Sequence, residues 1–502
     1  MTFNSSAFIF VFLPVALLGF HLLGRFGRRP AIGWLAFMSV VFYSRWVPVF
    51  VVVLLASIAL NYWFTLLIAG AAPKPRLQHW ILVAGIAANL CLLGFFKYLF
   101  PLADFLHEHG VLAHDWGRVT LPLGISFFTF TQIAYLVDLK QGQAERQGLL
   151  SYILFVTFFP HLIAGPILHH KEIMPQFAEE RRYRLDAADL ALGLSWFIAG
   201  LFKKVMVADR IAPYANALYA DPAHAGAWAA WFGALIYLLQ LYFDFSGYSD
   251  MAVGLARMFS IRFPFNFNSP YKASGMIDYW QRWHMTLTRF LTLYVYNPIA
   301  LGAGRRRAAK GKKISRKALA TPQGFLSLLF FPTMVTMFLA GVWHGAGLQF
   351  LVFGLLHGSY LCINHAWRTF VPAESRWNQL LPYPVCVAIT LLCVIVADVF
   401  FRAPSLRDCF AVLAGMSGLH GSGAPWNPSD AALLAALFAW VWLMPNAQQL
   451  FRQERPGDEK SWSLFPGLSW RPNAAWGALV AGAFLLSLIY AEEGSTFLYF
   501  QF

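Results

Sequence analysis

The chain has 502 residues, of which 58% are hydrophobic and 12% are charged, and its mean hydropathy is +0.54. Soluble globular domains carry roughly a quarter charged residues, so this composition excludes that class and indicates an integral membrane protein. The formal net charge of +14 is interpreted as basic cytoplasmic loops, which are typical of membrane proteins, and no nucleic-acid partner is expected.

Apolar stretches recur along the whole chain. Crossing a hydrocarbon core of ~30 Å takes about 20 helical residues. We therefore predict an all-α polytopic membrane protein of roughly ten to twelve crossings, formed as a single domain over residues 1–502. The stretches cover residues 7–23, 31–43, 47–70, 79–100, 122–137, 150–167, 186–207, 225–243, 288–302, 324–342, 348–366, 383–401, 430–445 and 473–491.

Three of these stretches, 31–43, 122–137 and 288–302, are short for a crossing. We expect tilted, paired or re-entrant helices there, buried in protein or lining water. The first stretch, 7–23, has no basic residue before it and several arginines behind it. That order is the reverse of a cleavable signal peptide, so the segment is expected to be retained with the N-terminus outside.

Five cysteines lie in largely apolar stretches without the spacing of metal ligands: Cys91, Cys362, Cys386, Cys393 and Cys409. They are interpreted as packing residues, so neither a disulfide nor a metal site is predicted.

A carboxylate pair lies at the end of the stretch 225–243. Asp244 and Asp250 are six residues apart, and Tyr242 precedes them. A carboxylate at membrane depth must be hydrogen-bonded, paired or neutralised. These residues are candidates for substrate binding, and the structural alternative is that the carboxylates tie helices together.

Arg282, Trp283 and His284 form a second candidate group. Tryptophan and arginine also anchor interfacial helices, so that alternative stays open for this segment taken by itself.

His344, preceded by Trp343, lies between two apolar stretches and among Gly341, Gly345 and Gly347. An ionisable side chain at membrane depth is costly and usually has a function there. The glycines interrupt the apolar pattern and allow close approach of the backbone or a ligand. A neutral imidazole can take a proton from a hydroxyl and return one to a leaving group, so His344 is the main catalytic candidate.

Eight lysines and arginines without an acid occur between residues 305 and 317: Arg305, Arg306, Arg307, Lys310, Lys312, Lys313, Arg316 and Lys317. We predict that this basic segment is cytoplasmic. It can orient the chain and contact anionic membrane lipid. It can also concentrate a polyanionic cofactor such as coenzyme A, and both roles can hold together.

Five phrases, in this order, resemble the membrane-bound O-acyltransferases, and within them the bacterial alginate O-acetylation protein I branch, which is also similar to the D-alanyl transfer proteins of teichoic acid. The resemblance runs over most of residues 1–405, and Phe401–Pro404 fits it too. The phrases are Pro122–Phe128 (PLGISFF), Phe159–Pro166 (FPHLIAGP), Leu241–Asp250 (LYFDFSGYSD), Trp280–His284 (WQRWH) and Gly341–Gly345 (GVWHG).

The resemblance implies an O-acetyltransferase of the bacterial inner membrane. It would take acetyl from cytoplasmic acetyl-CoA, without a metal, and deliver it outward for O-acetylation of an exported polysaccharide through a periplasmic esterase-like acceptor protein. In that family the histidine matching His344 is the essential catalytic residue, and the one matching His284 is its companion. Substrate contacts are expected from Trp343, Trp283, Arg282, Tyr242, Asp244 and Asp250.

Two departures from the alginate branch leave the glycan open. Gln281 stands where those relatives carry Arg, and residues 296–301 replace their run ending in Pro-Leu-Gly-Gly. Acetylated cellulose, another exopolysaccharide and peptidoglycan are alternatives to alginate. From another class, a transporter or flippase would use Asp244, Asp250 and His344 as a proton or substrate path, although no paired repeat is visible. A non-catalytic scaffold would leave the buried ionisable residues unexplained.

Overall fold

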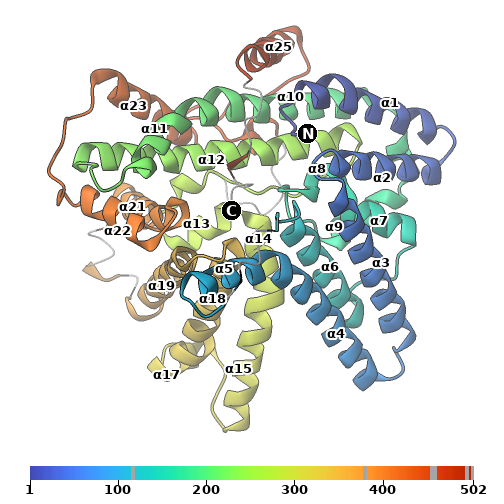
Figure 1. The fold of residues 1–502 in the computed structure, drawn as a ribbon, viewed down its shortest axis with the longest axis horizontal. Helices are drawn as coiled ribbons and strands as arrows, with labels where there is room; N and C mark the ends of the chain where they lie inside the picture. The colour runs from blue at the N-terminus through green and yellow to red at the C-terminus, as the bar shows by residue number, and fades with distance from the viewer. Residues whose placement is uncertain are drawn as a thin grey trace. The chain divides into compact units, whose positions relative to one another are not determined.

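The computed structural model describes residues 1–112, 114, 119–372, 374–376, 381–452, 461–491 and 497–498. Within these ranges every regular element is a helix (Figure 1). By length and composition, 6 helical segments could cross a membrane: Val49–Gly70, Pro75–Glu108, Ala187–Ala220, Ala227–Met258, Pro322–His344 and Tyr383–Arg402. Shorter apolar helices are Phe8–Gly24, Pro428–Leu443 and Ala474–Ile489. The predicted all-α polytopic class is confirmed, and the predicted number of crossings stays a prediction.

The chain divides into two compact units. Unit 1 comprises Met1–Met206, Phe245–Phe265 and Arg471–Gln501, and unit 2 comprises Val207–Asp244 and Asn266–Trp470. Helix α12 (Ala227–Met258) contributes its first part to unit 2 and its second part to unit 1. The expectation of a single domain stays a prediction, and the two units are described separately.

Unit 1 contains most of the N-terminal helices. They are α1 (Leu13–Gly24), α2 (Arg28–Ser44), α3 (Val49–Gly70), α4 (Pro75–Gly94), α5 (Phe100–Glu108), α6 (Ile125–Lys140), α7 (Leu149–Thr157), α8 (Phe159–Leu162), α9 (His170–Ala178), α10 (Ala187–Phe202) and α25 (Ala474–Ile489). Two of the short stretches became α2 and α6, of 17 and 16 residues. Most of α6, 12 of its 16 residues, is buried, as expected for a short helix that is packed inside protein.

Small residues bring α10 and the second part of α12 together. A Cβ on Gly254 would lie 2.5 Å from the carbonyl oxygen of Gly193, and one on Gly247 would lie 2.8 Å from that of Gly200. Close helix packing through glycine is a main source of association inside a bilayer, where no hydrophobic force acts between helices. Larger residues at these positions would separate the two helices.

Buried amides join other helices of unit 1. Asn89 on α4 donates to Oδ1 of Asn61 on α3 at 2.7 Å, and Asn61 donates back at 3.1 Å. Gln132 on α6 donates to Ser57 at 3.0 Å and accepts from the hydroxyl of Tyr152 at 3.2 Å. These bonds satisfy polar groups that would be expensive to leave in an apolar interior.

Unit 2 contains the remaining helices. They are α11 (Asp209–Ala220), α13 (Met276–Arg282), α14 (Met285–Leu291), α15 (Asn297–Ala309), α16 (Arg316–Leu319), α17 (Pro322–Phe325), α18 (Phe331–His344), α19 (Leu348–Phe370), α21 (Tyr383–Arg402), α22 (Leu406–Met416), α23 (Pro428–Leu443) and α24 (Ala447–Leu450). The third short stretch, 288–302, is split between α14, a π-helical turn Thr292–Tyr296 and α15.

Helices α18 and α19 form a tight hairpin in unit 2 (Figure 1). Gly354 on α19 faces Gly341 on α18, where an added Cβ would lie 3.0 Å from the opposite Cα. Gly345 adopts an extended conformation after His344 and ends α18 there. The glycines around His344 therefore close the hairpin and place the histidine at the end of its helix.

Candidate active site

His344 is buried among aromatic rings at the C-terminus of α18. Only 8% of the surface of His344 is exposed. The imidazole centroid lies 4.7 Å from the Trp343 ring, 5.6 Å from that of Phe353 and 5.0 Å from that of Phe401, each in an edge-on arrangement. These rings come from α18, α19 and α21, so three helices of unit 2 form the surroundings of the main catalytic candidate.

His284 occupies a left-handed backbone conformation between α13 and α14, with φ of 43° and ψ of 51°. This region is unfavourable for a residue other than glycine, and such conformations cluster at functional sites where the surrounding structure imposes them. Here Asn266 supplies that constraint. Its carbonyl oxygen accepts from the amide of Met285 at 2.9 Å, and its Oδ1 accepts from the hydroxyl of Thr286 at 2.6 Å.

The His284 ring is fixed and neutral. Its Nδ1 lies 3.3 Å from Oδ1 of Asn266, and the residue is 2% exposed. Burial lowers the pKa of His284 to about 3, because desolvation penalises the imidazolium ion. Near neutral pH this histidine therefore offers hydrogen bonds and no positive charge.

A chain of ring contacts connects the two histidine segments within unit 2. Trp283 stacks on Tyr279 at 5.8 Å and 13°, and Tyr279 is parallel to His357 at 6.3 Å and 8°. The His357 ring in turn contacts Phe353 at 4.6 Å, and Phe353 contacts His344. The structure thus places both predicted histidines in the same unit and joins their surroundings through one aromatic cluster.

His357 on α19 was not singled out from the sequence. It is 1% exposed, and its Nδ1 accepts a hydrogen bond from Nε1 of Trp280 at 3.3 Å. Since an indole nitrogen only donates, this bond assigns the neutral His357 ring its proton on Nε2. Asp398 on α21 was also missed and is 5% exposed. Both are ionisable residues in apolar helices, so the rule that identified His344 could have found them.

Tyr242 and Trp283 belong to the same aromatic cluster. The Tyr242 ring lies 5.2 Å from that of Tyr271 and 5.9 Å from that of Phe267. The Trp283 ring lies 5.0 Å from that of Phe267 and is parallel to Tyr271 at 6.2 Å. Asp244 lies on the same helix as Tyr242 and also belongs to unit 2. It is buried, with 2% of its surface exposed.

Arg282 makes a set of structural contacts. Its Nε donates to Oδ1 of Asp278 at 2.5 Å, and its Nη1 donates to the Ser461 hydroxyl at 2.8 Å and to the carbonyl of Asn268 at 3.3 Å. These bonds fix the segment that leads to His284. A direct contact between Arg282 and substrate stays a prediction.

Asp250 lies apart from the other predicted site residues. It belongs to unit 1, where its Oδ2 accepts from the ammonium group of Lys203 at 2.6 Å. The side chains are 13% and 15% exposed. This pairing supports the structural alternative for Asp250, in which the carboxylate ties α12 to the end of α10. Its expected contact with substrate stays a prediction.

An apolar cavity of about 850 Å³ lies in unit 2 between α12, α21 and α23. It is lined by residues such as Leu238, Leu391 and Phe438, and Lys272 contributes the charged group. Burial, with a smaller contribution from Arg282, lowers the pKa of Lys272 to about 8. The lining includes neither His344 nor His284, so this cavity is distinct from the histidine cluster.

Comparison with known proteins supplies the family. The family model of the membrane-bound O-acyltransferases matches residues 125–315. A peptidoglycan O-acetyltransferase of Helicobacter pylori is 39% identical over 84% of this chain and 80% of its own length. A protein of Pseudomonas aeruginosa named "Probable alginate O-acetylase AlgI" is 36% identical over 83% of this chain and 75% of its own length.

The name of a less similar relative specifies D-alanyl in place of acetyl. The teichoic acid D-alanyltransferase of Bacillus subtilis is 26% identical over 76% of this chain and 94% of its own length. Together with the helical fold and the buried histidines, these matches confirm the expected resemblance. The chain belongs to the membrane-bound O-acyltransferase family and is a multi-pass membrane enzyme that transfers acyl groups to hydroxyls.

Proposed function

We propose that this O-acyltransferase takes acetyl from acetyl-CoA at the cytoplasmic side of the bacterial inner membrane for O-acetylation of an exported polysaccharide. A periplasmic protein with an esterase-like fold would receive the acetyl group first. The names of the relatives support acetyl as the acyl group and a cell-surface glycan as the final acceptor, since they specify peptidoglycan and alginate. The alternative of a transporter or flippase has no such support.

The burial of His344 among three helices is the observation that carries the proposed mechanism. The imidazole of His344 takes the proton from the attacking hydroxyl while the hydroxyl oxygen forms a bond to the thioester carbon. The carbon–sulfur bond then breaks, and the proton passes from the imidazolium to the departing thiolate of coenzyme A. General base catalysis of this kind contributes typically 10²–10⁴-fold to a rate.

The thioester carbonyl becomes an oxyanion during this transfer and needs hydrogen-bond donors. We assign this role to the aromatic N–H and O–H groups of Trp283 and Tyr242 or to backbone amides beside Gly345. A neutral His284 suits the positioning of the acyl group or acceptor, because burial holds its pKa at about 3. Trp343, Arg282 and Asp244 would complete the contacts to substrate.

The basic segment 305–317 provides a site for attraction of the donor. The last turns of α15 contain Arg305, Arg306 and Arg307. Coenzyme A carries several phosphate charges, so a cluster of positive charge at a cytoplasmic entrance would raise its local concentration. The same charges would hold anionic lipid headgroups. The apolar cavity that Lys272 lines would suit lipid hydrocarbon.

The test is the acetyl-ester content of cell-surface glycan in cells that carry His344→Ala in place of the wild-type enzyme. We expect acetylation to fall by at least about 100-fold, the lower end of the effect of a general base. Membrane expression must be verified by immunoblot. The matched control is His224→Ala, since the His224 side chain is 83% exposed and pairs with Asp221 at the surface.

Purified enzyme gives a second measurement that identifies the donor. Wild-type protein with its periplasmic partner should consume radiolabelled acetyl-CoA, and His344→Ala should not. Ester content equal to wild type in cells with well-expressed His344→Ala would refute the catalytic role. Consumption of another acyl thioester in preference to acetyl-CoA would refute acetyl as the transferred group.

A further inference from the structure

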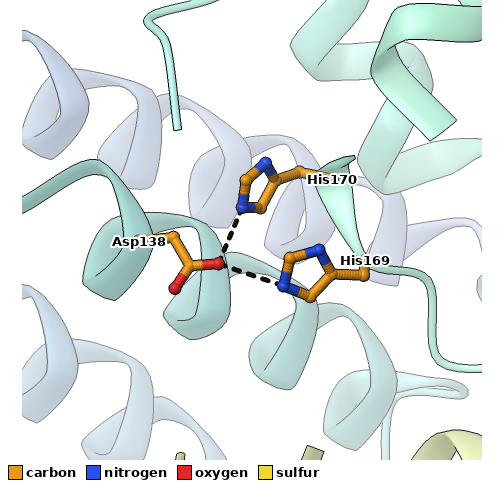
Figure 2. A group of neighbouring side chains, drawn as sticks. All are labelled: Asp138, His169 and His170. Carbon is orange, nitrogen blue, oxygen red and sulfur yellow. Dashed lines mark hydrogen bonds and ion pairs between the residues drawn. The ribbon is translucent and has the colours of Figure 1, made fainter. Parts of the chain in front are cut away.

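Two consecutive histidines at the start of α9 converge on a single carboxylate of α6 in unit 1 (Figure 2). The Nε2 atom of His170 lies 2.7 Å from Oδ2 of Asp138, and Nε2 of His169 lies 3.0 Å from the same oxygen. One ligand atom from each of the three residues lies within 4.8 Å of the others. None of these residues has a part in the proposed acyl transfer, which takes place in unit 2.

The three side chains are held in place by their surroundings. Asp138 is 3% and His170 is 5% exposed, while the His169 side chain is 14% exposed. The ring of Tyr135 packs edge-on against that of His170 at 5.5 Å. The Tyr135 hydroxyl in turn donates to the carbonyl of Glu145 at 2.9 Å. Donor atoms on buried, packed side chains retain their orientation, which favours a site over a transient contact.

The geometry is close to that of a bound metal ion. Zinc bonds to imidazole nitrogen at ~2.0–2.1 Å and to carboxylate oxygen at ~2.0–2.2 Å, so tetrahedral ligand atoms are roughly 3.3 Å apart. The observed separations of 2.7 and 3.0 Å suit two N–H···O hydrogen bonds. Opening the two pairs by roughly 0.6 and 0.3 Å through side-chain rotation would bring both to the ligand spacing of a bound ion.

One hydrogen bond changes if an ion binds. The backbone amide of Lys171 donates to Nδ1 of His169 at 3.3 Å, which requires the proton of that ring to be on Nε2. Coordination through Nε2 moves the proton to Nδ1, so this long bond would have to break. The ammonium group of Lys171 donates to Oε1 of Gln143 at 2.8 Å, an interaction with a neutral amide that can remain when the cluster is loaded.

We propose that Asp138, His169 and His170 bind a divalent transition-metal ion, with zinc as the ion that fits best. Two imidazoles and one carboxylate are a ligand set that zinc uses, and softer or harder ions prefer sulfur or all-oxygen ligands. The three protein ligands leave a fourth position for water on the more exposed side, next to His169. The ion would cross-link the end of α6 to the start of α9 and stabilise unit 1.

No metal site was predicted from the sequence, because the five cysteines lack the spacing of metal ligands. Histidines 169 and 170 and Asp138 are about thirty positions apart in the chain, so no short motif marks them. Their convergence depends on how α6 and α9 pack within unit 1.

The experiment uses full-length protein purified in detergent with an affinity tag that lacks histidine. After chelator treatment, reloading with zinc and removal of free metal, bound zinc is measured by inductively coupled plasma mass spectrometry. We expect about one zinc per wild-type chain, and on the order of 100-fold weaker binding in Asp138→Asn and in the double variant His169→Ala, His170→Ala. The matched control is His107→Ala, His109→Ala, because both residues are exposed at the C-terminal end of α5.

Two further measurements keep the result independent of misfolding. His169→Ala alone removes the most exposed ligand, so its size-exclusion profile should match the wild type while its zinc content falls. Cobalt added to the wild-type protein should give visible absorption bands of a nitrogen- and oxygen-ligated ion, which need no variant. Zinc content in the wild type no higher than in Asp138→Asn would overturn the proposal and leave a hydrogen-bonded cluster. Equal loss in the control pair would overturn it as well.

Discussion

The histidines of the candidate active site in unit 2 and those of the Asp138 cluster in unit 1 have different neighbours. In unit 2, His344 and His357 are surrounded by aromatic rings, and His284 is held by the neutral amide of Asn266. In unit 1, His169 and His170 face a carboxylate. Burial lowers the pKa of His284, whereas the Asp138 carboxylate gives the two histidines of unit 1 an anionic partner that can share a metal ion with them.

The buried carboxylates show the same contrast. Asp250 in unit 1 is paired with Lys203 at 2.6 Å. Asp398 in unit 2 is 5% exposed on α21, three residues before the Phe401 ring that contacts His344. We therefore interpret Asp250 as a structural residue of unit 1 and place the proposed reaction centre in unit 2. The following experiments test this division, beginning with the largest expected effect.

Asp250→Asn should destabilise the protein without impairing catalysis by the molecules that remain folded. Removing one partner of a buried ion pair costs about 3–5 kcal/mol in the free energy of unfolding. Adding Lys203→Met to this variant should recover much of the loss. Thermal unfolding in detergent and turnover per folded molecule provide the two readouts.

The control for this experiment is Asp221→Asn. The Asp221 side chain is 63% exposed and pairs with an exposed histidine, so its loss should have no measurable effect on unfolding. If Asp250→Asn lowered turnover in protein of unchanged stability, Asp250 would belong to the catalytic machinery, and the division between the units would be wrong.

Acidification should destabilise the fold through His284. Its folded pKa of about 3 lies below the unfolded value near 6.5, so between these values the unfolded chain binds the proton more tightly. The contribution of this residue is therefore complete above pH ~6.5 and is lost as the pH falls, at about 1.4 kcal/mol per pH unit and about 2 kcal/mol by pH 5.

The comparison for His284 is His284→Asn, because asparagine tolerates the left-handed conformation and does not titrate. Unfolding of both proteins is measured between pH 7 and pH 4.5. The wild type should lose stability more steeply than the variant below pH 6.5. Parallel curves would mean that His284 is hydrated and that its surroundings are open to water.

Trp280→Phe should have the smallest effect. It removes the N–H that donates to Nδ1 of His357 and leaves a buried nitrogen without that partner, which costs about 1 kcal/mol, or roughly 5-fold in kcat if His357 positions the site. His357→Phe should lower kcat at least as much. Because both changes break one contact, combining them should add little.

Acetyl-CoA turnover of the purified variants, corrected for folded protein, is the measurement for Trp280 and His357. Trp63→Phe is the control, since Trp63 is 52% exposed on α3 in unit 1. Strictly additive losses in the double variant would show that the two side chains act separately. Unchanged kcat in both single variants would remove His357 from the site.

Most of the fold class could be predicted from the sequence, and the positions of site residues only in part. Apolar stretches correspond to helices because a bilayer forces the backbone to satisfy its own hydrogen bonds. His344 was identified because ionisable groups are costly in an apolar chain, and His284 because its Arg-Trp-His phrase resembles that of the family. His357 and Asp398 are also buried ionisable residues in apolar helices, so the rule that applies to His344 applies to them, although no motif marks them.

Other features could not be predicted from local pattern. Asp244 and Asp250 are six residues apart on one helix, yet they belong to different units, and only the packing of α10 against α12 shows that Asp250 meets Lys203. Asp138 likewise meets His169 and His170 only because α6 and α9 both pack against α7.

By itself the sequence determined that this is a helical membrane protein with an ionisable histidine in a glycine-rich phrase, because hydropathy and the cost of charge in lipid act on each segment separately. The enzyme class followed from the resemblance of five phrases to the membrane-bound O-acyltransferases. Tertiary structure decided which polar groups are partners, since side chains from distant segments meet only after the helices pack. The aromatic surroundings of His344, the ion pair of Asp250 and the cluster of Asp138 with two histidines all depend on that packing.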